Sequence, residues 1–123
     1  MAVHRMLVVE DHDGTRTAVQ VIFTRLGWHV STARTVAEGL ARLDSDPEPC
    51  CLLLDLDLPD GGGEAVLARV REKGLRTRVA VATGSMDLPR LRAVADLEPD
   101  LLLAKPITTA DIWDGLCRVC EAH

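Results

Sequence analysis

The chain has 123 residues, of which 47% are hydrophobic and 27% are charged, with a formal net charge of −5. We expect one globular domain over residues 1–123, and the acidic balance argues against nucleic-acid binding, for which a basic face is expected. No apolar stretch reaches the roughly 18 residues of a membrane span and no signal-peptide core is present, so a cytoplasmic protein without membrane contact is expected.

The first half of the chain predicts two strands that alternate with two helices. Residues 5–9 (RMLVV) predict a short buried strand, and a helix that Asp13 can cap runs from there to about Leu26. Residues 28–33 (WHVSTA) alternate in polarity, which suits an edge strand. Thr35 is the expected cap of a second helix, which ends at Asp46 and two prolines.

The centre of the chain is the stretch CCLLLDLDLPDGGG. Its apolar run, residues 50–54, does not alternate, which indicates a strand buried on both faces of a parallel sheet. Carboxylates follow at Asp55, Asp57 and Asp60, and we expect Pro59 and the glycines to prevent any further strand. The chain past residue 54 is therefore predicted to be an acidic loop.

The second half continues the alternation to the end of the chain. It predicts a helix over residues 64–73, a strand over 78–82, a helix over 88–97, a strand over 100–104 and a final helix that Thr108 or Thr109 caps. Five alternations of strand and helix indicate an α/β three-layer doubly wound sandwich, with a five-stranded parallel sheet of order 2-1-3-4-5. This is the flavodoxin-like arrangement.

The four cysteines occupy apolar positions at Cys50, Cys51, Cys117 and Cys120. The last two have the CxxC spacing, but they fall inside a helical pattern. We therefore expect buried reduced thiols and no disulfide scaffold, which would suit a smaller domain richer in loops.

Polar groups of complementary type follow the predicted strands. Glu10 and Asp11 follow the first strand, Asp55 the third, Thr83 the fourth and Lys105 the fifth, and the carboxyl ends of parallel strands meet at one edge. Clustered carboxylates repel, and a hard cation such as Mg²⁺ relieves that repulsion. A hydroxyl and an ammonium suit phosphate oxygens. The set predicts phosphoryl transfer onto a carboxylate, with Asp55 as the reactive group.

These residues resemble the response regulator receiver domain of two-component signalling, as in chemotaxis regulators. The matching pieces are VVEDH at 8–12, LLLDLDLPDG at 52–61, VATG at 81–84 and AKP at 104–106. Each piece is weak alone, since acid pairs and a Lys-Pro are common. In this order, each at a strand end, they are specific, and the resemblance covers essentially the whole chain.

The resemblance implies a signalling switch that is not an enzyme. Asp55 would accept a phosphoryl group from a histidine kinase or a histidine phosphotransfer protein, Thr83 would be the switch hydroxyl, and Lys105 the phosphate partner. The output protein is not identified by the sequence. The family also implies Mg²⁺ with these ligands: Glu10, Asp11, Asp55 and the main-chain carbonyl of Asp57.

The chain departs from the family pattern at three positions. Leu102 replaces the usual aromatic residue three positions before the lysine, Asp57 makes the variable position two residues after the phosphoacceptor acidic, and Gly84 stands where alanine is common. None of these changes removes the phosphorylation chemistry. His12, which follows the acid pair, is expected to be a solvated or capping side chain and not a metal ligand.

Two other functions compete with this interpretation. Asp55 and Asp57 also form a DxD motif like that of haloacid dehalogenase-type phosphatases, but those enzymes carry it on their first strand and place an acid pair after their lysine. A pseudo-receiver, an interaction module that is never phosphorylated, is the third interpretation. Retention of all the pocket groups argues against it.

Overall fold

The computed structural model describes residues 4–105, 108, 110–111 and 114–115. Five strands form one parallel sheet in the order β2-β1-β3-β6-β7, which is 2-1-3-4-5 when these five are counted along the chain. Their bounds are β1 Arg5–Val9, β2 His29–Ala33, β3 Cys51–Asp55, β6 Arg78–Thr83 and β7 Leu101–Ala104. The predicted sheet and strand order are confirmed, with β2 at an edge as expected.

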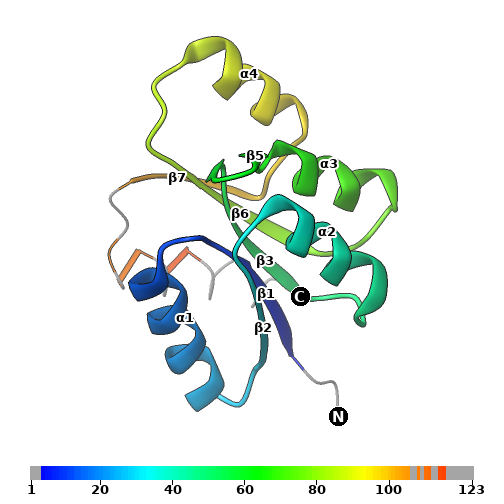
Figure 1. Ribbon diagram of the computed structural model, residues 1–123, viewed down its shortest axis with the longest axis vertical. Coiled ribbons are helices and arrows are strands. Elements are labelled where there is room, and N and C mark those ends of the chain that lie inside the picture. The colour runs from blue at the N-terminus through cyan, green and yellow to red at the C-terminus, as the bar shows by residue number, and fades with distance from the viewer. Residues whose placement is uncertain (1–3, 106–107, 109, 112–113, 116–123) are drawn as a thin grey trace.

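Helices cover both faces of this sheet, and Figure 1 shows α1 on the face opposite α2 and α3. Four helices have bounds that lie wholly within the described residues: α1 Asp13–Arg25, α2 Val36–Ser45, α3 Glu64–Glu72 and α4 Leu88–Asp96. Alternate strand residues enter two separate apolar clusters. Leu52 and Leu54 pack in the cluster that contains residues of α2, α3 and α4, while Leu53 packs with Val19 and Phe23 of α1. The three-layer sandwich is therefore confirmed.

Strand β3 is the centre of the sheet. All five of its residues are buried, because it pairs with β1 on one side and β6 on the other. It begins and ends one residue later than predicted. The ladder continues past the apolar run because Asp55 pairs with Ala82 and the Leu56 amide donates to the Ala82 carbonyl at 2.9 Å. Asp55 is thus held by sheet hydrogen bonding and not by a loop.

The expectation that Pro59 and the glycines directly after β3 prevent a further strand is wrong. Two short strands, β4 (Asp57–Leu58) and β5 (Gly61–Gly62), form an antiparallel hairpin that turns at Pro59 and Asp60. Two-residue strands tolerate proline and glycine, because the proline sits in the turn and donates no ladder bond. The Asp60 carboxylate accepts hydrogen bonds from the amides of Val36 and Ala37 at 2.8 and 3.1 Å, so the hairpin also caps α2.

The helix caps agree only in part with prediction. Thr35 caps α2 as expected, with its hydroxyl accepting from the Glu38 amide at 3.1 Å. Helix α1 is capped by His12, not Asp13, since His12 Nδ1 accepts from the Thr15 amide at 3.2 Å. His12 is therefore a capping side chain, as predicted. For the last helix, Thr108 and Asp111 exchange reciprocal backbone-to-side-chain bonds, each of 3.1 Å, as in a capping box.

Some sequence-based expectations fall outside the described residues or differ from the structure. The predicted alternative cap Thr109 and the cysteines at 117 and 120 are outside that range. Cys51 is buried at the start of β3 and is disulfide-bonded, so the expectation of a reduced thiol is wrong for this residue. Among the described residues, no helix has the length and apolar character needed to cross a membrane.

Candidate functional site

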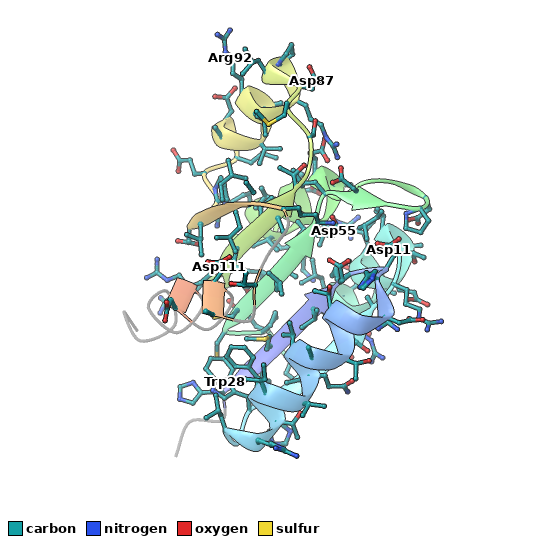
Figure 2. All side chains as sticks on the ribbon, turned by 90° about the vertical axis from the view of Figure 1, so that its left-hand side faces the viewer. Asp11, Trp28, Asp55, Asp87, Arg92 and Asp111 are labelled. Atoms are coloured by element: carbon teal, nitrogen blue, oxygen red, sulfur yellow. The ribbon has the colours of Figure 1, made fainter. Side chains whose placement is uncertain are left out.

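The predicted site residues meet at the carboxyl edge of the sheet. Asp55 is the last residue of β3 and Thr83 the last of β6, while the acid pair directly follows β1. Lys105 directly follows β7, and its amide donates to the Thr83 carbonyl at 2.9 Å. Figure 2 shows Asp55 and Asp11 together at this end of the sheet, with Trp28 at the other end.

The Asp55 carboxylate is almost fully buried, with 1% of the residue exposed. Its Oδ1 accepts from Lys105 Nζ at 2.8 Å and from the Asp57 amide at 2.8 Å. Its Oδ2 is buried and has no hydrogen-bond partner among the described residues. A buried carboxylate oxygen without a partner is costly, so this atom indicates a ligand that the described residues do not supply.

Three carboxylates converge beside that oxygen. One oxygen each of Glu10, Asp11 and Asp55 lies within 4.8 Å of the others, and Glu10 and Asp55 are buried while Asp11 is exposed. Burial raises the pKa of Glu10, and the negative charge of Asp55 raises it further. Hard oxygen ligands, one buried and unpartnered, fit a small divalent cation such as Mg²⁺.

Arg16 of α1 hydrogen-bonds the main chain of the acid pair, Glu10 and Asp11. Its Nη1 donates to the Glu10 carbonyl at 3.0 Å and to the Asp11 carbonyl at 3.4 Å. The His12 amide donates to Glu10 Oε1 at 3.1 Å. These bonds fix the main chain of both residues and the carboxylate of Glu10. A cleft opens beside them that is lined by Glu10, Asp11, His12, Asp13, Gly14, Thr15 and Lys105.

Lys105 supplies the positive charge that contacts Asp55. Burial, the largest single influence, opposes its charge, but the hydrogen bond to Asp55 and the charges of Asp55 and Glu10 outweigh it, so the pKa of Lys105 is raised. The ammonium therefore stays protonated and neutralises part of the negative charge that the carboxylates bring together.

Thr83 is buried, with 4% of the residue exposed. Its hydroxyl oxygen accepts from the Ser85 amide at 3.0 Å and lies 3.5 Å from Asp57 Oδ2. The next residue, Gly84, is exposed and donates its amide to Asp57 Oδ2 at 3.1 Å. Thr83 therefore stands at the same edge as Asp55, one strand away, with its hydroxyl proton directed at a carboxylate.

Asp57 is bound on both of its carboxylate oxygens. Oδ1 accepts from Arg90 Nη1 at 2.9 Å, and Oδ2 accepts from the Gly84 amide. Burial, the largest influence, works against its charge, but the bonds from Gly84 and Arg90 prevail and lower the pKa of Asp57. Its side chain is not in the three-carboxylate cluster, and the predicted metal contact concerns its main-chain carbonyl.

Arg90 is the residue of this site that the sequence does not reveal. It lies in α4, 33 positions after Asp57, and no spacing pattern connects the two. Only an arginine near the start of a helix that follows Thr83 was visible in the sequence, and such arginines are common.

Leu102, at the position of the missing aromatic residue, lies in β7 opposite Val81 and is 44% exposed.

The sequence is similar to known signalling proteins. The model of the response regulator receiver domain family matches residues 6–116. The photosynthetic apparatus regulatory protein RegA of Rhodobacter capsulatus is 28% identical over 117 residues, which are 95% of this chain and 63% of that protein. The transcriptional regulatory protein DltR of Streptococcus agalactiae is 32% identical over 108 residues, 88% of this chain and 48% of that protein.

The fold has close structural relatives. A CheY-like response regulator receiver domain protein of Methanospirillum hungatei superposes with a TM-score of 0.89 at 22% identity, covering 98% of this chain and 96% of that one. The chain thus spans nearly the whole of that structure. By contrast, it spans about half to two thirds of the two curated regulators.

Proposed function

The chain belongs to the response regulator receiver domain family, and from this premise we propose that it is a switch phosphorylated on Asp55. Receiver domains are signalling modules of two-component systems. The observation that supports Asp55 as the acceptor is its carboxylate, buried at the end of β3. One oxygen bonds Lys105, and the other lies beside the acid pair with no hydrogen-bond partner in the part of the chain that the structure describes.

The transfer needs little covalent chemistry from the protein. An Asp55 oxygen attacks the phosphorus of the donor, a new P–O bond forms, and the bond to the leaving group breaks with its electron pair. The leaving group is an imidazole nitrogen for a phosphohistidine donor or acetate for acetyl phosphate. Lys105 already contacts the Asp55 carboxylate, so it is in place to stabilise oxygens that carry the transferred charge.

Mg²⁺ is the cation that we propose for the acid cluster, held by Glu10, Asp11, Asp55 and the main-chain carbonyl of Asp57. When bound, it would neutralise carboxylate charge and attract the phosphate oxygens of the donor. The remaining work belongs to the chain: the bonds from Arg16 and His12 hold the acid pair, and Lys105 orients Asp55.

The partners and location are proposed on the same basis. A histidine kinase or a histidine phosphotransfer protein is the donor that the family implies, acting in the cytoplasm. The output partner is a protein or domain that reads the phosphorylated surface. We propose a switch function and no catalytic turnover for this chain.

The test is phosphorylation by acetyl phosphate or phosphoramidate, read as intact mass. With Mg²⁺ the wild type should gain one phosphoryl group, whereas EDTA or Asp55→Asn should abolish the gain. Asp87→Asn is the matched control, because Asp87 is exposed and makes no side-chain cap bond at α4. It should label like wild type. Undiminished labelling of Asp55→Asn would refute the assignment.

The phosphatase and pseudo-receiver alternatives predict different results with small phosphorylated compounds. A phosphatase releases many equivalents of p-nitrophenol from p-nitrophenyl phosphate, whereas a receiver does not. A pseudo-receiver gains no mass with either small donor. The position of Asp55 on the central strand β3, and not on the first strand, favours the receiver over the phosphatase.

A further inference from the structure

The Asp57 carboxylate accepts hydrogen bonds from two donors at the start of the β6–α4 loop. Its Oδ2 lies 3.1 Å from the Gly84 amide nitrogen and 3.5 Å from the Thr83 hydroxyl oxygen. The same residue is tied to the reactive carboxylate, because its amide donates to Asp55 Oδ1 at 2.8 Å. Asp57 therefore places a second anion beside Asp55, on groups suited to binding oxyanions.

Arg90 holds that second anion in place. Besides its bond to Asp57 Oδ1, its guanidinium makes a two-pronged pair with Glu64, with Nε–Oε2 and Nη2–Oε1 distances of 3.0 Å each. Nη2 also donates to the Leu56 carbonyl at 2.6 Å. Bidentate arginine–carboxylate pairs fix geometry as well as charge. Glu64 begins α3, so the network joins α3, α4 and the chain just after Asp55.

This network has the features of a built structure and not of a chance surface pair. The Arg90 side chain is 24% exposed, against 38% for Asp57 and 31% for Glu64. Hydrogen bonds to Glu64 and Asp57 raise the pKa of Arg90 further above its ordinary value. Every nitrogen of the guanidinium makes at least one of these contacts.

Asp55 pairs with Ala82, the residue before Thr83, so a phosphoryl group on Asp55 would lie near the Thr83 hydroxyl and the Gly84 amide that now bond Asp57. A hydroxyl has one proton to donate, and the Thr83 oxygen already accepts from the Ser85 amide, so Thr83 can donate either to Asp57 or to a new oxyanion. Gly84 likewise has one amide proton, now directed at Asp57. The two anions compete for the same donors.

We propose that Asp57 and Arg90 are positioning residues of the phosphoryl site: Asp57 occupies the Thr83 and Gly84 donors before transfer, and Arg90, braced by Glu64, holds it there. This inference rests on the proposed phosphorylation of Asp55 and adds to it an internal competitor. Arg90 belongs to α4 and Glu64 to α3. Displacement of Asp57 would therefore break a direct contact with α4.

The proposal predicts how an oxyanion mimic binds. Asp57→Asn removes the competing charge and should tighten beryllofluoride binding, a phosphoryl mimic, by about tenfold, the change that roughly 1.4 kcal/mol produces. Arg90→Met should tighten it by a smaller factor of about threefold, because a carboxylate that is no longer held turns to water. In the Asp57→Asn background the same Arg90→Met change should have no effect.

The assay is calorimetric titration with beryllofluoride and Mg²⁺, at low and high salt, together with the Gly84 amide resonance. Competition for donors is short-range, so the affinity ratio should persist at high salt, whereas repulsion of an incoming anion would be screened. In Asp57→Asn the Gly84 resonance should move before any ligand is added. Arg92→Met is the matched control, since Arg92 is exposed on the same helix, away from Asp55 (Figure 2), and should bind like wild type.

The outcomes separate this inference from the proposed function. If wild type binds beryllofluoride but Asp57→Asn binds no tighter, the competitor role is wrong while the phosphorylation site stands. A gain that vanishes at high salt would also overturn it, in favour of simple repulsion. Additive effects of the two substitutions would remove Arg90 from the proposal. If wild type neither binds beryllofluoride nor takes phosphate, the proposed function itself fails.

Discussion

Replacing Gly63 by alanine should distort the strand end that carries Asp55. A Cβ at Gly63 would lie 3.0 Å from Leu56 Cα and 3.2 Å from the Asp55 main-chain carbon, and closer still to the Asp55 main-chain oxygen. All of these atoms are backbone, which cannot move aside as the end of a flexible side chain can. The Gly63 φ of −64° is ordinary for alanine, so steric contact is the only source of the effect.

The loss of unfolding free energy in Gly63→Ala follows from the kind of contact that its Cβ makes. Overpacking of this type costs about 1–3 kcal/mol, and the lower chain entropy of unfolded alanine returns about 0.4–1 kcal/mol. The net loss of unfolding free energy is about 1–2 kcal/mol, which lowers the melting temperature of a chain of this length by about 4–8 °C. Since the Asp55 backbone has to shift, labelling by acetyl phosphate should also slow, by about tenfold or more.

Gly84→Ala is the matched control. Its Cβ would meet only ordinary contacts, 3.9 Å from Lys105 Cβ and 4.0 Å from Asp57 Oδ2, and Gly84 is not among the glycines with positive φ. Thermal unfolding followed by circular dichroism, with mass-detected labelling of the same samples, compares the two variants. If Gly63→Ala melts and labels like Gly84→Ala, the close approach of Gly63 to Asp55 does not constrain the site.

Two further predictions concern the metal and pH. Mg²⁺ at a hundred times its dissociation constant should add about 2.7 kcal/mol to the unfolding free energy of the wild type and so raise its melting temperature. Asp11→Asn should fold normally, because Asp11 is exposed, and lose most of that gain. The bond from the Val36 amide, followed by that from Ala37, lowers the pKa of Asp60, so its contribution to stability is complete above the ordinary aspartate range and is lost as pH falls through the lowered folded value. The melting temperatures of wild type and Asp60→Ala should therefore differ most at neutral pH and converge as pH falls below about 4; a constant difference from neutral to strongly acidic pH would show that the Asp60 charge does not cap α2.

The sheet and the edge that carries the candidate site were readable from the sequence because their signals are local. An apolar run such as residues 50–54 records burial on both faces, and the first polar residue after such a run marks a strand end. Parallel strands then bring Asp55, Thr83 and Lys105 to one edge, whatever the loops between them do. The prediction of this edge needed only strand order, which alternation with helices supplies.

Tertiary structure alone decided what surrounds Asp55. The hairpin at Asp57–Leu58 was hidden because proline and glycine signal an interruption but not which short segments pair around it. The contact of Asp57 with Arg90 joins residues 33 positions apart, and the cap that Asp60 places on α2 joins residues 24 positions apart. Such polar pairings depend on where loops and helix ends meet in space, and they leave no periodicity along the chain. For that reason the sequence shows that Asp57 is acidic, whereas the bond from Gly84 to this carboxylate follows from how α3 and α4 pack against the sheet.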